Sequence, residues 1–419
     1  MCRTARGKFH GAVLLFAALL LAACGSTPRN ASHAYTPLLL ISIDGYRADY
    51  LARGLSPNLS ALADHGVHAA AMRSAFPTLT FPNHYTIVTG LYPDHTGIVN
   101  NRFVDPSSGA KFVYNDPKTT ADPAWWGGEP LWVTAERQGK HAATMFWPGS
   151  DVPIQSVRPA HWLPFDGKIP PDARVDQVLA WLDLPAAERP EFVTLYFDQV
   201  DHAGHDFGPD SVQVSAALRQ VDSAVARLVD GLRQRRLLDS TNIVVVSDHG
   251  MTPSGPERVI VLDDLIDLQH LDLVNAGVLA GITAKPGYEQ EIESALLTPH
   301  EHMHCWKKEA VPARLHYGSN PRIPALLCLA NDGWQVTTRE YLARPNHHIS
   351  LGEHGYDNDD PNMRALFVAH GPAFRHHLEI PQFDNVDLYP LLARLLGLRP
   401  APNDGDARVL LPVLAQGSH

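Results

Sequence analysis

The chain has 419 residues, of which 45% are hydrophobic and 19% are charged, and its formal net charge at pH 7 is -11. This length allows one large domain with inserts. The acidic balance argues against nucleic-acid binding, which depends on basic side chains that neutralise phosphates. The four cysteines form no CxxC pair of the kind found in structural zinc sites. Any bound metal ion would therefore be held by Asp and His, and no protein partner is implied.

The first 23 residues are predicted to be a leader that is removed from the mature protein. Arg3, Arg6 and Lys8 precede an apolar run too short to span a bilayer comfortably, and small residues then lead to Cys24. This pattern resembles a bacterial lipoprotein signal, in which the cysteine carries a lipid and becomes the N-terminus. An ordinary signal peptide with an incidental Cys24 is the alternative. In both cases the protein is expected to be exported.

The rest of the chain is expected to form a tether over residues 24–36 and one domain over residues 37–415. With a lipid on Cys24, the protein would lie in the periplasm, and the glycine after that cysteine favours the outer membrane. In an oxidising compartment Cys305 and Cys328 could form a disulfide, or they could be two separate buried thiols.

Apolar runs of strand length and helical patterns alternate along this domain. Strands are predicted over residues 38–43, 192–197, 243–246 and 365–368. Helices are predicted over residues 57–65, 129–138, 175–182 and 218–232. Runs that are apolar throughout are typical of strands buried on both faces. Together these elements predict an α/β fold with a mostly parallel central sheet flanked by helices on both faces.

Polar residues follow three of these strands. Asp44 comes directly after the first strand, Asp201 and His205 follow the second, and Asp248 and His249 follow the third. Because ligands bind at the carboxyl ends of strands in such sheets, we expect these side chains to converge. A mixture of carboxylate and imidazole ligands suits zinc. The sequence therefore predicts a catalytic metal centre at this edge of the sheet.

Each of these signals is weak when taken alone. The Asp-His dipeptide occurs four times, and the chain has 23 histidines. Asp64-His65-Gly66 lies at the end of a predicted helix, where a histidine and a glycine are ordinary. His354 alone would be read as a loop histidine.

The combination of segments is far more specific than any one of them. The informative segments are Asp44-Gly45, Thr80-Phe81-Pro82-Asn83-His84-Tyr85, Asn101, Gly128-Glu129-Pro130, Trp147-Pro148-Gly149-Ser150-Asp151, Asp201 with Gly204-His205, Ser247-Asp248-His249-Gly250, and His354-Gly355. With these segments in this order, the chain resembles the nucleotide pyrophosphatase/phosphodiesterase family of the alkaline phosphatase superfamily. It is expected to be an exported bacterial member.

The resemblance implies an alkaline-phosphatase-like catalytic domain over residues 37–415 with two zinc ions per chain. One zinc would be held by Asp201, His205 and His354. The other would be held by Asp44, Asp248, His249 and the oxygen of Thr80. Thr80 would be the nucleophile that forms a phosphothreonine intermediate. Thr78 is a rival hydroxyl nearby, but the family nucleophile directly precedes Phe-Pro-Asn.

The resemblance also implies a nucleotide site. Asn101 and the Thr80 amide would hold a nonbridging phosphate oxygen, Phe81 and Tyr196 would flank the base, and Trp147 and Asp151 would line the same pocket. The expected reaction is hydrolysis of nucleotide phosphodiester or pyrophosphate bonds to nucleoside 5'-monophosphates. An alternative is a phospholipid or choline phosphodiesterase on the same metal core. A third reading, from a different class, is a surface binding protein without activity.

Overall fold

An eight-stranded sheet lies at the centre of the computed structural model, which describes residues 35–416. The strand order is β19-β2-β18-β9-β1-β8-β6-β7. The bounds are Leu38–Ile43 for β1, Val67–Ala69 for β2, Ala142–Met145 for β6, His161–Leu163 for β7, Phe192–Phe197 for β8, Asn242–Val246 for β9, Phe367–His370 for β18 and Leu378–Ile380 for β19. Only β18 is antiparallel to its neighbours; the other pairs are parallel. The predicted α/β fold with a mostly parallel sheet is confirmed.

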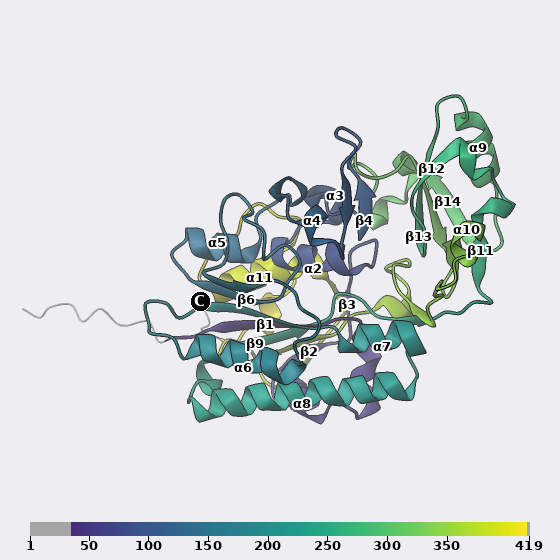
Figure 1. The fold of residues 1–419 in the computed structure, drawn as a ribbon. Helices are drawn as coiled ribbons and strands as arrows, with labels where there is room; N and C mark the ends of the chain where they lie inside the picture. The colour runs from purple at the N-terminus through teal and green to yellow at the C-terminus, as the bar shows by residue number, and fades with distance from the viewer. Residues whose placement is uncertain (1–34, 417–419) are drawn as a thin grey trace, which may run out of the picture. The chain divides into compact units, whose positions relative to one another are not determined.

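Helices cover both faces of this sheet (Figure 1). Along β1, Leu39 and Ile41 pack into the core formed with α1 (Pro57–Asp64), α6 (Pro171–Leu182) and α8 (Val212–Gln234). Leu38 and Leu40 point to the opposite core, formed with α2 (Thr80–Thr89), α5 (Leu131–Arg137) and α11 (Leu388–Leu395). Every residue of β1 is buried, as its mostly apolar sequence predicts.

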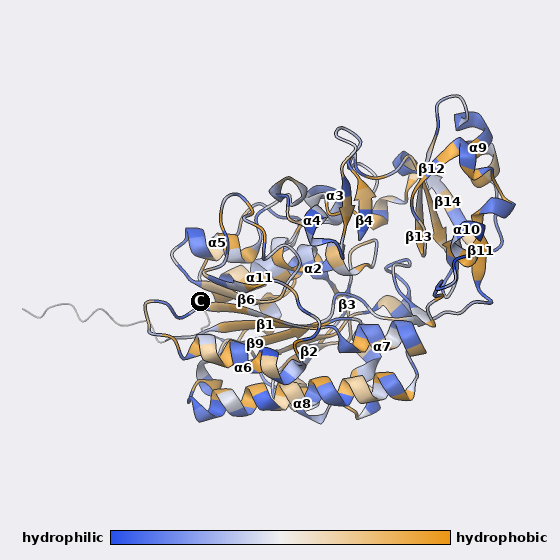
Figure 2. Ribbon diagram, viewed as in Figure 1, coloured by the Kyte–Doolittle hydropathy of each residue, from blue (hydrophilic) through white to orange (hydrophobic). Residues whose placement is uncertain are grey.

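Helix α8 shows how the sequence pattern produces this packing. Its buried face includes Leu218, Val221, Val225 and Leu228, which recur at the spacing of an amphipathic helix. Ser211 precedes the helix, and its hydroxyl oxygen accepts a hydrogen bond of 3.1 Å from the Val214 amide. Figure 2 shows the resulting alternation of hydrophobic and hydrophilic residues along α8 beside the hydrophobic strands.

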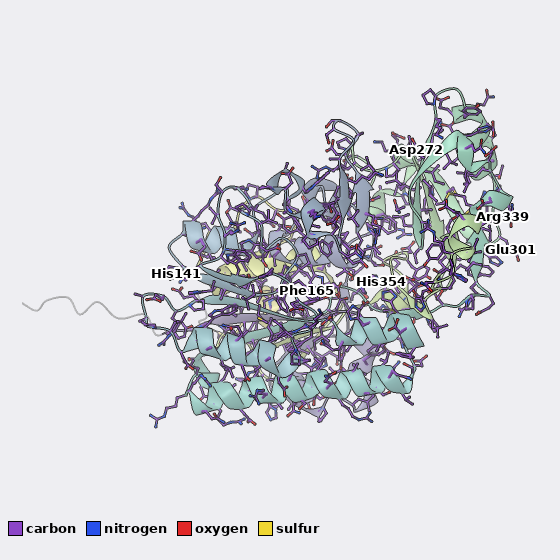
Figure 3. All side chains as sticks on the ribbon, viewed as in Figure 1. His141, Phe165, Asp272, Glu301, Arg339 and His354 are labelled. Atoms are coloured by element: carbon purple, nitrogen blue, oxygen red, sulfur yellow. A yellow bond between two sulfur atoms is a disulfide. The ribbon has the colours of Figure 1, made fainter. Side chains whose placement is uncertain are left out.

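A second sheet is inserted between β9 and β18. Its strand order is β12-β13-β15-β14, with β12 at Leu271–Asn275, β13 at Leu279–Ala284, β15 at Leu326–Ala330 and β14 at Met303–Lys307. The sheet and α9 (Glu289–Leu296) share a separate hydrophobic core. Asp272 and Glu301 mark this insert in Figure 3. Cys305 and Cys328 lie opposite each other on β14 and β15 and form a disulfide, which decides between the two alternatives for these cysteines.

The predicted leader over residues 1–23 and most of the predicted tether lie outside the described residues. Within residues 35–416, no helix is both long enough and apolar enough to cross a membrane. The domain boundaries, the lipid on Cys24 and export stay predictions.

Candidate metal and active site

The strand ends bring the predicted carboxylates together. Because β1 pairs in parallel with both β8 and β9, all three strands end at the same edge of the sheet. Asp44 directly follows β1, and Asp248 follows β9 after one intervening residue. Asp201 lies in α7 (Gln199–Phe207), the helix that follows β8. All three carboxylates are buried.

Glycine at position 45 permits this close approach. Gly45 has a φ of +67°, and a Cβ atom there would lie 3.0 Å from the Cα of Asp201. A side chain would therefore be strained by the backbone conformation and crowded by the neighbouring ligand segment. The Gly45 amide also donates to Asp248 Oδ1 at 3.3 Å, which links the segments after β1 and β9.

The structure brings together Asp201, His205 and His354, the three residues expected to hold one zinc, as a first candidate ligand cluster. The Nε2 atoms of His205 and His354 lie 3.5 and 3.7 Å from Asp201 Oδ1. The Nδ1 atom of His205 donates to the carbonyl oxygen of Gly352, and that of His354 donates to the carbonyl oxygen of Thr78, each at 2.8 Å. Such backbone contacts fix the ring orientation and leave Nε2 as the metal-binding nitrogen.

The second cluster centres on His249. Its Nε2 atom lies 2.9 Å from Asp248 Oδ2 and 3.3 Å from Asp44 Oδ1, and its Nδ1 atom donates to the Gly250 carbonyl oxygen at 2.9 Å. The His249 and His354 rings stack with their centroids 3.5 Å apart, so the two clusters adjoin. Asp44, Asp201 and His249 also have ligand atoms within 4.8 Å of one another.

The unpaired oxygen atoms of this centre fit bound cations. Asp44 Oδ1, Asp201 Oδ1 and Asp248 Oδ2 are buried and accept no hydrogen bond. Burial raises the pKa of Asp44 well above its usual range, and the nearby carboxylates of Asp248 and Asp201 raise it further. Buried carboxylates this close together need positive charge, and the histidine nitrogens facing them are typical transition-metal ligands. The chain therefore contains two candidate buried metal sites.

Thr80 begins helix α2 beside these sites. Its Oγ1 atom lies 3.3 Å from His249 Nε2. As the first helical residue, its amide is one of the N–H groups that a helix cannot satisfy internally. Asn101 Oδ1 accepts a hydrogen bond of 3.0 Å from the Phe81 amide, which turns the Asn101 NH2 group away from that contact. The Thr80 amide and the Asn101 side chain thus both lie at the first turn of α2.

The rival hydroxyl of Thr78 is used elsewhere. It donates to the Tyr356 carbonyl oxygen and accepts from the Gly355 amide, both at 3.0 Å. Thr78 is fully buried. Its hydroxyl therefore ties the segment before α2 to the loop that carries His354.

His84 also belongs to this candidate centre, although it is not among the predicted site residues. Its Nδ1 atom donates to the Thr80 carbonyl oxygen at 2.9 Å and lies 3.2 Å from Asp248 Oδ2. Its Nε2 atom accepts from the Ser42 hydroxyl at 2.8 Å. His84 lies close enough to Asp44 and Asp248 to share a metal ion with them. Because both ring nitrogens have protein partners, its contribution here is to hold α2 against β1. The four-residue spacing from Thr80 was the available signal in the sequence.

The predicted base-binding residues occupy different environments. The Tyr196 hydroxyl donates to Asp44 Oδ2 at 2.6 Å. Trp147 is only 4% exposed, and its Nε1 atom donates to the His84 carbonyl oxygen at 2.9 Å. Phe81 contacts the exposed ring of Tyr114, with the centroids 5.8 Å apart. Asp151 is partly buried, and burial raises its pKa.

Phe165 is an exposed aromatic residue that the predicted site did not include. Its ring lies 5.9 Å from that of Tyr196, and the residue is 56% exposed. Figure 3 labels Phe165 together with His354. The family resemblance indicated Phe165 as an extension of the pocket, but only through a loose alignment.

Residues 38–357 match the family described as type I phosphodiesterase / nucleotide pyrophosphatase. The chain belongs to this family. It is 37% identical over 410 residues to a pyrophosphatase/phosphodiesterase of Schizosaccharomyces pombe that is described as uncharacterized, covering 95% of this chain and 84% of that protein. It is 39% identical over 384 residues to human ectonucleotide pyrophosphatase/phosphodiesterase family member 1, covering 88% of this chain and 41% of the human protein.

The fold agrees with this membership in the type I phosphodiesterase family. The structure of murine ectonucleotide pyrophosphatase/phosphodiesterase 5 aligns with a TM-score of 0.86 and 34% sequence identity, covering 91% of this chain and all of that one. The chain spans less than half the length of the human relative and of the Macrovipera lebetinus venom phosphodiesterase, of which it covers 44%. At the level of the family, the predicted hydrolase class is confirmed.

Proposed function

We propose that this chain hydrolyses nucleotide phosphodiester or pyrophosphate bonds to nucleoside 5'-monophosphates, with two zinc ions and Thr80 as the nucleophile. The observation that carries the proposal is the position of the Thr80 hydroxyl, 3.3 Å from His249 Nε2 at the N-terminus of α2. A structure of murine ectonucleotide pyrophosphatase/phosphodiesterase 5 in complex with AMP is described as an inactive threonine-to-alanine variant. A nucleotide product and a threonine nucleophile are consistent with that description.

Each residue of the candidate site has its own role in the proposed double displacement. The Thr80 oxygen attacks phosphorus, which forms a phosphothreonine and releases the first product; water then hydrolyses this ester. The Thr80 amide and the Asn101 NH2 group would donate to a nonbridging phosphate oxygen, and their position at the first turn of α2 supports this role. His84 donates to the Thr80 carbonyl oxygen and so fixes the first turn of α2. Zinc bound by the two clusters would supply Lewis acidity and lower the pKa of oxygen nucleophiles.

The charge of the site favours a diester. Two divalent ions exceed the charge of the three buried aspartates, Asp44, Asp201 and Asp248, by a single positive charge. Arg102 lies next to Asn101, but its guanidinium lies over the Tyr114 ring and donates to Asn115. A monoanionic diester therefore fits the centre better than a dianionic monoester, which would require more positive charge.

The substrate is proposed to carry a nucleobase. Phe81 directly follows Thr80 at the start of α2, and the Tyr196 hydroxyl donates to the candidate ligand Asp44, so both residues are near the proposed reacting centre. A flat base suits such rings better than a flexible lipid chain does. We further propose export with a lipid on Cys24, and the disulfide between Cys305 and Cys328 is consistent with an oxidising compartment.

Thr80→Ala tests the mechanism against Thr78→Ser as the matched control. The substrates are the nitrophenyl ester of thymidine 5'-monophosphate, nitrophenyl phosphate and nitrophenylphosphorylcholine. Thr80→Ala is expected to lower kcat on the nucleotide ester by about a thousandfold or more while the zinc content is retained. Thr78→Ser keeps the hydroxyl and should have little effect. Unchanged turnover in Thr80→Ala would exclude the mechanism, and a preference of wild type for the choline ester would exclude the substrate class.

A further inference from the structure

A fully buried arginine lies behind the aromatic side of the site. Arg174, on α6, is 0% exposed. Its Nη1 atom donates to the Tyr196 carbonyl oxygen at 2.9 Å and pairs with Asp198 Oδ1 at 2.7 Å, and its Nε atom donates to the Ile169 carbonyl oxygen at 2.8 Å. Burying a guanidinium is costly unless its donors are paired. The proposed catalytic mechanism does not use the Arg174 guanidinium, so its burial at this position requires another explanation.

Two aromatic rings pack against the same guanidinium, and a third ring, that of Tyr196, adjoins one of them. The Cζ atom of Arg174 lies 5.2 Å from the Phe146 ring centroid and 6.0 Å from that of Phe165. The Phe165 ring meets Phe146 at 5.2 Å and Tyr196 at 5.9 Å, both edge to face. We call Phe146, Phe165 and Tyr196 the aromatic wall. Its members come from the end of β6, the loop before α6 and β8, so local sequence alone does not assemble it.

Phe165 is the most exposed member of the aromatic wall. It is 56% exposed, whereas Phe146 is 1% exposed. Arg174 Nε binds Ile169 at the other end of the loop that carries Phe165, and Arg174 Nη1 binds the main chain of Tyr196. Tyr196 in turn donates to Asp44 at 2.6 Å. A single side chain therefore fixes the exposed ring relative to the metal centre.

We propose that Arg174 is a positioning residue for base recognition, which holds Phe165 beside Tyr196 so that a flat base can stack at the metal centre. The inference rests on the proposed nucleotide substrate and identifies what makes the enzyme select it. An arginine is required because its planar fork presents several donors in a fixed geometry. Lysine could neutralise Asp198, but it would donate from one nitrogen, whereas Arg174 reaches Ile169 and Tyr196 from two separate nitrogens in a fixed geometry.

Arg174→Lys is the diagnostic substitution. The measured quantity is the ratio of kcat/KM for the nitrophenyl ester of thymidine 5'-monophosphate to that for methyl nitrophenyl phosphate, which has no base. We expect this ratio to fall about 5- to 10-fold, mainly through KM, because base stacking on an aromatic side chain is weakened. The inhibition constant of AMP should rise by a similar factor, while that of inorganic phosphate should not change.

A double-mutant cycle distinguishes a role of Arg174 in positioning Phe165 from a general loss of structure. Phe165→Ala should lower the same ratio, and combining it with Arg174→Lys should add little further loss, because both act through one ring. Arg227→Lys is the matched control, since Arg227 forms an exposed bidentate pair with Asp176 on α6 and lies outside the wall. It should leave the ratio unchanged.

Several outcomes would overturn the inference. If Arg174→Lys lowers kcat/KM equally for both substrates, the role of Arg174 is only structural. The same conclusion follows if the effects of Arg174→Lys and Phe165→Ala on the kcat/KM ratio are fully additive. Should Arg174→Lys fail to fold, Phe165→Ala still decides, because its exposed ring can be removed without leaving a buried charge. An unchanged kcat/KM ratio in Phe165→Ala would then exclude a role of the aromatic wall in base recognition. If wild type itself shows no preference for the nucleotide ester, the proposed substrate class fails along with this inference.

Discussion

The hydroxyl of Tyr196 connects a proposed base-binding residue to the candidate metal centre. It donates to Asp44 Oδ2 at 2.6 Å, while the other oxygen of Asp44 is buried without a hydrogen bond beside His249. Burial raises the pKa of Tyr196 well above its usual range, and the Asp44 carboxylate adds to this, so the phenol remains a donor. We predict that Tyr196→Phe lowers zinc affinity at the Asp44 site about 10- to 100-fold, as is typical for the loss of a contact that orients a ligand. Zinc titration of the apoprotein measures this directly.

Tyr85→Phe provides the control for Tyr196→Phe. Tyr85 lies on α2, and its hydroxyl is buried without a hydrogen-bond partner. Its removal deletes an oxygen of the same kind without freeing a metal ligand, so zinc affinity should stay within about twofold of wild type. Equal zinc affinity in Tyr196→Phe and wild type would show that Asp44 needs no such donor.

The sequence predicts the positions of some residues of the candidate site but not of others. Asp44, Asp248 and His249 were predictable because each follows a buried strand, and parallel strands end at a shared edge. The contact between the Tyr196 hydroxyl and Asp44 was not predictable. The hydrophobic pattern of a strand does not indicate which polar atom lies within hydrogen-bonding distance of a tyrosine hydroxyl. Arg174 was equally hidden, because it sits in an ordinary amphipathic helix and its contacts come from a loop and a strand.

At the scale of elements, β17 (Gly352–Glu353) must pack directly against α7 to complete the first metal cluster. The Gly352 carbonyl oxygen accepts from His205, and the Leu351 amide donates to the His205 carbonyl oxygen, both at 2.8 Å. A Cβ atom at Gly352 would overlap the carbonyl oxygen of Gly204 on α7. His354 follows two residues later, so its position depends on this contact between backbones.

We therefore predict that Gly352→Ala displaces β17 and loses zinc from the cluster of Asp201, His205 and His354. Overpacking of this kind costs about 1–3 kcal/mol, so the midpoint of thermal unfolding should also fall. Gly204→Ala tests the same interface with a milder clash, because its Cβ would meet the flexible Met251 side chain at 2.8 Å. Elemental analysis and thermal melts should rank wild type above Gly204→Ala, and Gly204→Ala above Gly352→Ala. Full zinc occupancy in Gly352→Ala would contradict this account.

The strands with the clearest hydrophobic pattern were predicted most accurately. The predicted strands at 38–43 and 192–197 match β1 and β8, because apolar residues define their ends. The run at 365–368 was placed two residues before β18, and its antiparallel direction could not be read from hydrophobicity. The insert's sheet was not predicted, since its strands follow no motif and pack on a small core of their own.

At the scale of the whole molecule, the metal centre joins segments that are distant in the sequence. Its candidate ligands follow β1, lie in α7, follow β9 and follow β17. Without cations, three buried carboxylates would face one another with unpaired oxygens. The free energy of binding two ions is therefore expected to stabilise the whole central sheet, because ions that bind only the folded state shift the unfolding equilibrium.

We predict that removing zinc with a chelator lowers the midpoint of thermal unfolding by about 5 to 10 °C, since occupancy at a thousandfold excess over Kd contributes about 4 kcal/mol per site. Added Zn²⁺ should restore the midpoint, and Mg²⁺ should not, because imidazole nitrogens are poor magnesium ligands. Thr80→Ala should keep most of this shift, since the aspartates and histidines remain. His354→Ala should lose part of it. An identical midpoint with and without chelator would mean that these clustered carboxylates are neutralised by protons rather than by metal ions.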